Sequence, residues 1–172
     1  MDNISLAIQD ILEESEYGLD LRLLSGASGL THRVSSSRIQ KPGLALTGYT
    51  QHLHPARIQV LGNTEISYLS QLDEHLAWEH TRALCAFPIS CFIVTKGLEP
   101  PPFFLTVTEE SGIPVLGTHH QSSIFISLIT KFLEEQLLPS THLHGVLVDV
   151  LGVGVLLTGK SGIGKASARW IL

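Results

Sequence analysis

The chain has few of the residues that would tie it to a membrane, a metal or an oxidising compartment. Of its 172 residues only two are cysteines, Cys85 and Cys91, and their spacing matches neither a CxxC redox pair nor half of a zinc site. We therefore expect both to be reduced, buried thiols. No apolar run reaches the roughly 18 residues that span a bilayer, and the N-terminus has no basic segment like that of a secretory signal. These absences predict a cytoplasmic protein.

Charge is also sparse. Only 16% of the residues are charged, and the net charge is -5, which argues against a nucleic-acid or membrane-surface binder because such proteins usually carry a basic face. The hydrophobic fraction of 44% is typical of a compact globular protein that can also bury surface against partner subunits. A small-molecule or protein partner is favoured, and neither nucleic-acid nor membrane binding is expected.

Residues 1–138 alternate between strand and helix patterns. A helical stripe of Ile4, Ala7, Ile8, Ile11 and Leu12 predicts a first helix of about ten residues that ends before Gly18. Strands are then predicted at residues 21–23, 44–47, 57–62, 89–95 and 114–118. Further helices are predicted from Asn63 or Thr64 to about Ala86, after prolines 100–102, and over 122–138 with Ile124, Leu128, Phe132 and Leu133 on one stripe. This alternation predicts an α/β fold with a mainly parallel sheet.

The pattern changes after Pro139. We place a domain boundary at residues 138–140, which divides the chain into 1–138 and 139–172. Two apolar strands, 146–150 and 153–158, flank a turn at Leu151 and Gly152 and predict a β-hairpin. Antiparallel pairing about that turn joins positions whose numbers add to 303, so His144 is predicted to face Gly159.

A glycine-rich segment follows the second strand of this hairpin. It fits the phosphate-loop pattern G-x-x-x-x-G-K-[ST] at every position but the last, with the residues Gly159, Lys160, Ser161, Gly162, Ile163, Gly164, Lys165 and Ala166. In such a loop the backbone N–H groups surround phosphate oxygens and the lysine neutralises the terminal phosphates. The last position normally offers a hydroxyl to Mg²⁺. Ala166 has none, so no metal ligand is assigned. A tight glycine turn would explain the glycines but not Lys165.

The histidines admit two interpretations. His144, held beside the loop, could orient or deprotonate a nucleophile that attacks the terminal phosphate, although a histidine next to a glycine is more often structural. Histidines also form close pairs, at positions 52 and 54, 119 and 120, and 142 and 144. A metal site at any pair is disfavoured, because no fourth ligand, carboxylate pattern or cysteine partner converges with it.

Together, residues 144–150, 152–158 and the loop resemble the HPr kinase/phosphorylase family, as do residues 46–49, 54–65 and 95–98 upstream. The resemblance implies a cytoplasmic, usually hexameric enzyme that regulates carbon metabolism. Such an enzyme phosphorylates a serine of the phosphocarrier protein HPr with ATP and Mg²⁺, or with pyrophosphate, and reverses the step by phosphorolysis. It also implies that His144 and Lys165 are catalytic and that the N-terminal domain is similar to a substrate domain of Mur ligases.

The last residues depart from the family pattern. The family continues Gly-Lys-Ser-Glu into a long helix, whereas this chain reads Gly164, Lys165, Ala166, Ser167 and ends at Leu172. We hypothesise a shifted reading frame after codon 166 and expect a truncated P-loop kinase domain with weak or no activity. Downstream coding for an aspartate-bearing helix would support the hypothesis, and stop codons in every frame would contradict it.

Two other functions remain open at this point. One is a non-catalytic regulatory or oligomerisation module derived from the same enzyme. The other is a different phosphate-loop enzyme, which is disfavoured because such enzymes generally carry the loop near the start of a long domain.

Overall fold

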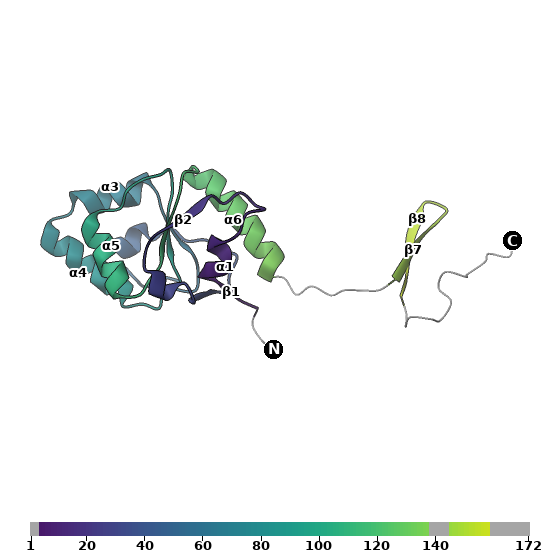
Figure 1. Cartoon of the computed structure of the whole chain (residues 1–172), viewed down its shortest axis with the longest axis horizontal. Helices are drawn as coiled ribbons and strands as arrows, with labels where there is room; N and C mark the ends of the chain where they lie inside the picture. Colours follow the sequence, from purple (N-terminus) through teal and green to yellow (C-terminus); the bar gives the residue numbers. More distant parts are fainter. Residues whose placement is uncertain (1–3, 138–144, 159–172) are drawn as a thin grey trace. The chain divides into compact units, whose positions relative to one another are not determined.

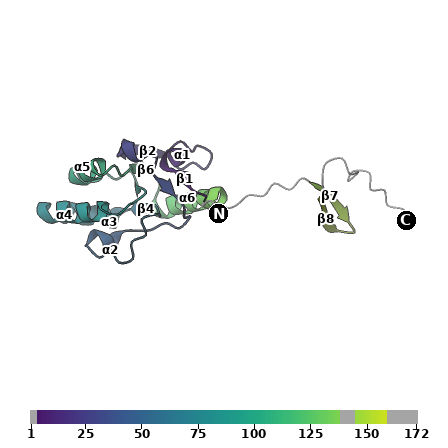
Figure 2. The ribbon, with the colours of Figure 1, turned by 90° about the horizontal axis from the view of Figure 1, so that it is seen from below.

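The structure is a computed structural model that describes residues 4–137 and 145–158. The chain divides into two compact units, Met1–Leu138 and Pro139–Leu172. The first unit is built on a four-stranded sheet with helices on both faces (Figures 1 and 2). The second unit contains the antiparallel hairpin of β7 (Gly145–Val150) and β8 (Val153–Thr158).

The sheet of the first unit is mixed and mostly parallel. Its strand order is β2-β6-β5-β4, in which β4, β5 and β6 run parallel and β2 is the antiparallel edge strand. A separate antiparallel pair joins β1 to β3. The strands are β1 (Leu6–Ala7), β2 (Leu21–Ser25), β3 (Arg33–Val34), β4 (Gln59–Leu61), β5 (Phe92–Val94) and β6 (Val115–Thr118). The predicted α/β class with a mainly parallel sheet is confirmed.

Each face of the sheet has its own hydrophobic core. Phe92 and Val94 of the central strand β5 pack on one side, and Ile93 packs on the other, because side chains alternate along a strand. Helices α2 to α5 contribute to the first core, and α1 and α6 contribute to the second. The helices are α1 (Ile8–Leu12), α2 (Gly43–Leu46), α3 (Asn63–Gln71), α4 (Glu74–Cys85), α5 (Pro102–Glu110) and α6 (Ser122–Leu137), with one 3₁₀ turn at Ala27–Gly29.

The first helix is shorter than its apolar periodicity predicted. Leu6 and Ala7 are extended and pair with β3, so the helix begins only at Ile8. Ile8 and Ile11 are fully buried, whereas Ile4 is exposed. Leu6 and Ala7 pair with residues of β3 that lie far along the chain, so this pairing cannot be predicted from the local sequence.

The predicted strand at residues 44–47 is wrong, because this segment is the short helix α2. A strand would direct neighbouring side chains to opposite faces, but Ala45 and Leu46 are both buried while Leu44 is 70% exposed. The Leu46 N–H donates to the Pro42 carbonyl at 2.9 Å. Gly48 follows with a φ of 93° and ends the turn.

Two helical predictions also need adjustment. The stretch after β4 is divided at Leu72, which is extended, and Asp73 caps α4 by accepting a hydrogen bond from the His75 N–H. On α6 the buried face is Phe125, Ile129, Phe132 and Leu133, whereas the predicted stripe member Ile124 is 49% exposed. Both stripes have helical spacing, and packing on the sheet selects between them. No helix in the described ranges is long and apolar enough to cross a membrane.

Candidate functional site

An antiparallel hairpin of β7 and β8 precedes the predicted phosphate loop. Its pairs run from Val150 opposite Val153, beside the turn, to Gly145 opposite Thr158. The position numbers of every pair add to 303, so the predicted register and turn are confirmed. Because a two-residue turn sets the register of both strands, it also sets which residues meet at the open end.

The turn itself has the backbone geometry that a tight hairpin needs. Leu151 and Gly152 have φ angles of 54° and 81°, and positive values at both central positions match the right-handed twist of the strands. The Gly152 N–H donates to Asp149 Oδ1 at 2.8 Å. The Leu151 side chain is fully exposed, so no packing within the hairpin compensates for its left-handed backbone.

The predicted catalytic and phosphate-binding residues follow directly from the open end of this hairpin. His144 precedes Gly145, and the loop begins immediately after Thr158. His144 and the loop residues Gly159, Lys160, Ser161, Gly162, Ile163, Gly164, Lys165 and Ala166 lie outside the described residues. Their placement therefore stays a prediction. The described hairpin supports it up to the pair of Gly145 and Thr158.

A second polar cluster lies in the first unit, where β4 ends and α3 begins. The Glu65 side chain accepts a hydrogen bond from the Gly62 N–H at 2.8 Å, and Lys41 Nζ lies 3.6 Å from the same carboxylate oxygen. Glu65 is 5% exposed. Its carboxylate satisfies one of the N–H groups that a helix start leaves without a partner, and Lys41 compensates its charge.

The same cluster connects the ends of two parallel strands to α6. The Thr95 hydroxyl donates to the Leu61 carbonyl at 3.2 Å, and it lies 2.6 Å from the Ser122 hydroxyl, which is left to act as the donor. A Cβ atom at Gly62 would lie 3.0 Å from the Ser122 Oγ and 3.4 Å from Lys41 Nζ. Residues 54–65 and 95–98, two of the segments that carried the family resemblance, therefore meet here.

Sequence reasoning did not single out this cluster. The position of Glu65 three residues after Gly62 is a signal for a helix start, but nothing local links Lys41 or Ser122 to it. Its polar contacts join the start of α3 to Lys41, and Leu61 at the end of β4 to Thr95 and through it to Ser122. We therefore assign it a structural role, which is to hold the strand ends together.

The histidine pairs show no shared ligand geometry in the described part of the chain. No three histidine, cysteine, aspartate or glutamate side chains within residues 4–137 and 145–158 lie close enough to hold a metal ion. His52 and His54 are exposed, and the His120 Nε2 lies 2.8 Å from the Gly18 carbonyl oxygen. The pair at 142 and 144 lies outside the described residues.

The two cysteines are free and buried, as predicted. Burial raises the pKa of the Cys85 thiol and of the Cys91 thiol to about 12, because a thiolate loses its hydration in an apolar core. Neither thiol is ionised near neutral pH, so neither is a candidate nucleophile.

Comparison with known proteins finds a matching family for each of the two units. The family described as HPr Serine kinase N terminus matches residues 6–133, and the HPr Serine kinase C-terminal domain matches residues 135–171. An HPr kinase/phosphorylase of Geobacter sulfurreducens is 70% identical over 166 residues, which cover 96% of this chain and 52% of that protein. HPr kinase/phosphorylases of Halalkalibacterium halodurans and Leptospira biflexa are each 40% identical and are covered over 49% and 50% of their lengths. The chain thus spans about half the length of these curated relatives.

Proposed function

The chain belongs to the HPr kinase/phosphorylase family, and from this membership we propose that it serves the phosphorylation of a serine of HPr. ATP or pyrophosphate is the phosphoryl donor, and phosphorolysis reverses the step. The match over residues 6–133 and the 70% identity to the Geobacter sulfurreducens protein support this proposal most strongly. We further propose that the protein acts in the cytoplasm as a homo-oligomer, with the hexamer of the family as the expected state.

The proposed phosphate site is the loop from Gly159 to Ala166. Its backbone N–H groups would surround the phosphate oxygens, and Lys165 would neutralise the charge of the terminal phosphates. Support comes from the position of the loop directly after β8, since a phosphate loop of this type follows a strand. In this arrangement the positive charge of Lys165 lies beside the negative phosphates of the bound donor.

His144 is the proposed catalytic histidine. If the described register continues by one residue beyond Gly145 and Thr158, His144 faces Gly159 at the start of the loop. An imidazole there can orient the serine hydroxyl, or take its proton, as its oxygen attacks the terminal phosphorus atom. The proposal thus gives His144 a role in transfer and Lys165 a role in binding and charge neutralisation.

The loop residues suit phosphate better than they suit Mg²⁺. Backbone N–H groups and Lys165 are donors to anionic oxygens, whereas the methyl side chain of Ala166 offers no oxygen to a cation. We therefore assign ATP or pyrophosphate to the loop and no metal-ligating residue within it. No step of the proposed mechanism passes through the metal.

We also propose the division of labour along the chain. Residues 1–138 form an N-terminal α/β domain similar to a Mur-ligase substrate domain, and residues 139–172 form the beginning of a P-loop kinase domain. The change of matching family between residues 133 and 135 and the two compact units support this boundary. Because the chain spans about half of its relatives, we expect donor binding by the loop but weak transfer to HPr by these 172 residues alone.

Parallel binding and transfer assays test the proposal. Binding of a fluorescent ATP analogue to the wild-type chain is compared with binding to Lys165→Ala and His144→Ala, and labelling of HPr by radioactive ATP is followed in the same preparations. We expect Lys165→Ala to weaken binding at least tenfold and His144→Ala to change it less than twofold. Equal binding by all three chains would contradict the assigned roles, and labelling of HPr by His144→Ala as fast as the weak labelling expected of the wild-type chain would exclude a catalytic role for His144.

A further inference from the structure

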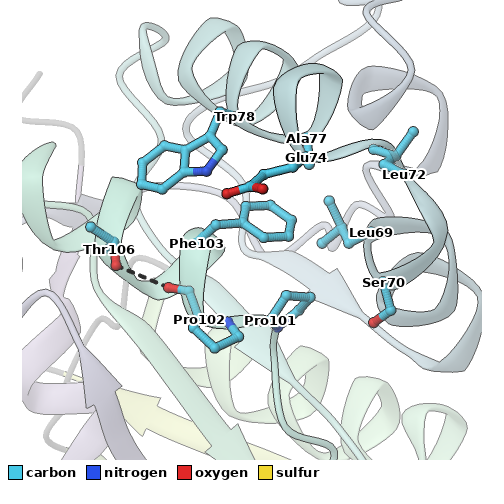
Figure 3. A pocket seen from close by; sticks show the side chains of 10 residues that line it. All are labelled: Leu69, Ser70, Leu72, Glu74, Ala77, Trp78, Pro101, Pro102, Phe103 and Thr106. Atoms are coloured by element: carbon cyan, nitrogen blue, oxygen red, sulfur yellow. Dashed lines mark hydrogen bonds between the residues drawn. The ribbon is translucent and has the colours of Figure 1, made fainter.

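An open pocket of about 600 Å³ lies in the first unit, far along the sequence from the phosphate loop (Figure 3). It is bordered by the last turn of α3, the first turns of α4 and the start of α5. Its volume is within the range of about 300–1,000 Å³ that is typical of small-molecule sites. The half-buried Leu72 supplies apolar wall, so a ligand with an apolar part fits this space.

Two aromatic rings line the pocket together. The ring centroids of Trp78 and Phe103 are 6.3 Å apart with an angle of 44° between the ring planes, and both side chains are only half-buried. The face of an aromatic ring attracts cations. Trp78 already shows this property, because the Arg82 Cζ lies 5.1 Å from its ring centroid, beside a separate hollow that Trp78 also lines.

A carboxylate faces the same space. Figure 3 shows the Glu74 side chain beside the rings of Trp78 and Phe103, as expected for residues 74 and 78, which lie one helical turn apart on α4. Glu74 has no ion-pair partner within the described part of the chain. Asp73, not Glu74, accepts the capping hydrogen bond at the start of α4. The negative charge of Glu74 is therefore available to a ligand.

Helix ends of opposite polarity border the pocket. Leu69 and Ser70, which line it, belong to the last turn of α3, and that turn contains no basic residue. The last carbonyl groups of a helix carry the negative end of its dipole. The starts of α4 and α5 also border the pocket and carry the positive ends of their dipoles. The helix ends therefore oppose one another, and the Glu74 carboxylate and the aromatic faces are what favour a ligand of positive charge.

We propose that this pocket binds a small organic cation, an ammonium or guanidinium group attached to an apolar body. The charged group lies between the Glu74 carboxylate and the Trp78 ring, and the apolar body packs against Leu72 and Phe103. This site is independent of phosphoryl transfer, since it uses no residue of the loop or the hairpin.

Titration of the full 172-residue chain with three probes tests the proposal, with ¹⁵N-labelled amide shifts as the measurement. Choline supplies the charge, 3,3-dimethylbutan-1-ol has the same shape without charge, and benzyltrimethylammonium adds an aromatic body. We expect choline to bind at least threefold more tightly than the alcohol, and benzyltrimethylammonium to bind more tightly than choline. The shifted amides should include those of residues 69–78 and 103–106.

Three variants locate the effect. Trp78→Leu should weaken both cations at least threefold, and Glu74→Gln should weaken them about threefold to tenfold while leaving the alcohol unchanged. Glu134→Gln, on α6 across the sheet, should change nothing, and circular dichroism verifies that each variant is folded. Equal affinity for choline and the alcohol, or an equal effect of Glu74→Gln and Glu134→Gln, would overturn the proposal.

Discussion

Gly145 and Thr158 are paired directly across the β7–β8 hairpin, at the end farthest from its turn. His144 precedes Gly145 in the sequence and the proposed phosphate loop follows Thr158, so this is the described pair nearest in sequence to the proposed site. The turn at Leu151 and Gly152 sets the pairing. We therefore expect the stability of this hairpin to affect how well His144 and the loop are held together.

Replacing the leucine in the turn should strengthen the hairpin. Leu151 has a φ of 54° and a fully exposed side chain, and a left-handed backbone costs a leucine about 1–2 kcal/mol. Asparagine tolerates this conformation, so Leu151→Asn should slow amide hydrogen exchange in β7 and β8 by about fivefold. Leu44→Asn, at an exposed leucine in helix α2, is the control. Faster exchange in Leu151→Asn than in the wild type would contradict this account of the turn.

Gly26 should tolerate a side chain far less well than Gly18. Both have positive φ angles, 76° and 63°, but a Cβ at Gly26 would lie 2.2 Å from the Ile113 carbonyl oxygen, whereas nothing lies within 4 Å at Gly18. Gly18→Ala should cost about 1 kcal/mol of unfolding free energy, from backbone strain alone. Gly26→Ala should cost at least about 3 kcal/mol, because strands β2 and β6 must separate locally. Urea denaturation of both variants measures the difference, and equal losses would show the close approach to be unimportant.

The Glu65 cluster should depend more on its carboxylate than on its lysine. Glu65→Ala removes a buried acceptor of the Gly62 N–H and should lower the unfolding free energy by about 2 kcal/mol. Lys41→Ala should cost about 1 kcal/mol or less, because the Lys41 side chain is 46% exposed and solvent screens its charge. Urea denaturation again measures both, with Glu65→Gln as the isosteric control. A larger loss for Lys41→Ala than for Glu65→Ala would reverse this order.

The buried thiols predict a loss of stability in alkali. Their pKa values rise from 9.0 in the exposed reference state to about 12 in the folded chain. The folded state therefore retains protons that the unfolded state releases between these values, so its advantage is complete below about pH 9 and declines as pH rises toward 12. Each thiol contributes a slope of at most about 1.4 kcal/mol per pH unit.

Thiol labelling and denaturation at several pH values test this prediction. A thiol reagent at pH 8 should label neither cysteine in the folded chain and both in urea. A variant with Cys85→Ala and Cys91→Ala should lose part of the decline in unfolding free energy above pH 9. Rapid labelling of the folded chain, or an unchanged slope in the variant, would contradict the assignment.

Prediction from the sequence succeeded where one local signal is sufficient. The hairpin register follows from two turn residues, Leu151 and Gly152, and β5 follows from an apolar, β-branched run that ends at Gly97. It failed where tertiary packing decides between two equal local patterns. Residues 44–47 form an apolar run too short to show a period, and α6 offers two helical stripes of which the sheet buries the one with Phe125.

The candidate sites show the same difference between local and long-range signals. The loop from Gly159 to Lys165 is a contiguous motif and can be found by inspection, whereas the contact of Lys41 with Glu65 joins distant segments and has no local signal. The pocket beside Trp78 likewise combines three helices. Its aromatic and acidic residues are unremarkable in sequence and become a candidate site only when the chain is folded.

The most direct test of the proposed function is the affinity of the 172-residue chain for ATP. We expect the wild-type chain to bind ATP, and Lys165→Ala to raise the Kd at least tenfold because the neutralising charge is lost. Lys131→Ala, at an exposed position on α6, should leave the Kd within twofold of the wild-type value. Failure of the wild-type chain to bind ATP, or equal Kd values for the wild type and Lys165→Ala, would contradict the phosphate-site assignment.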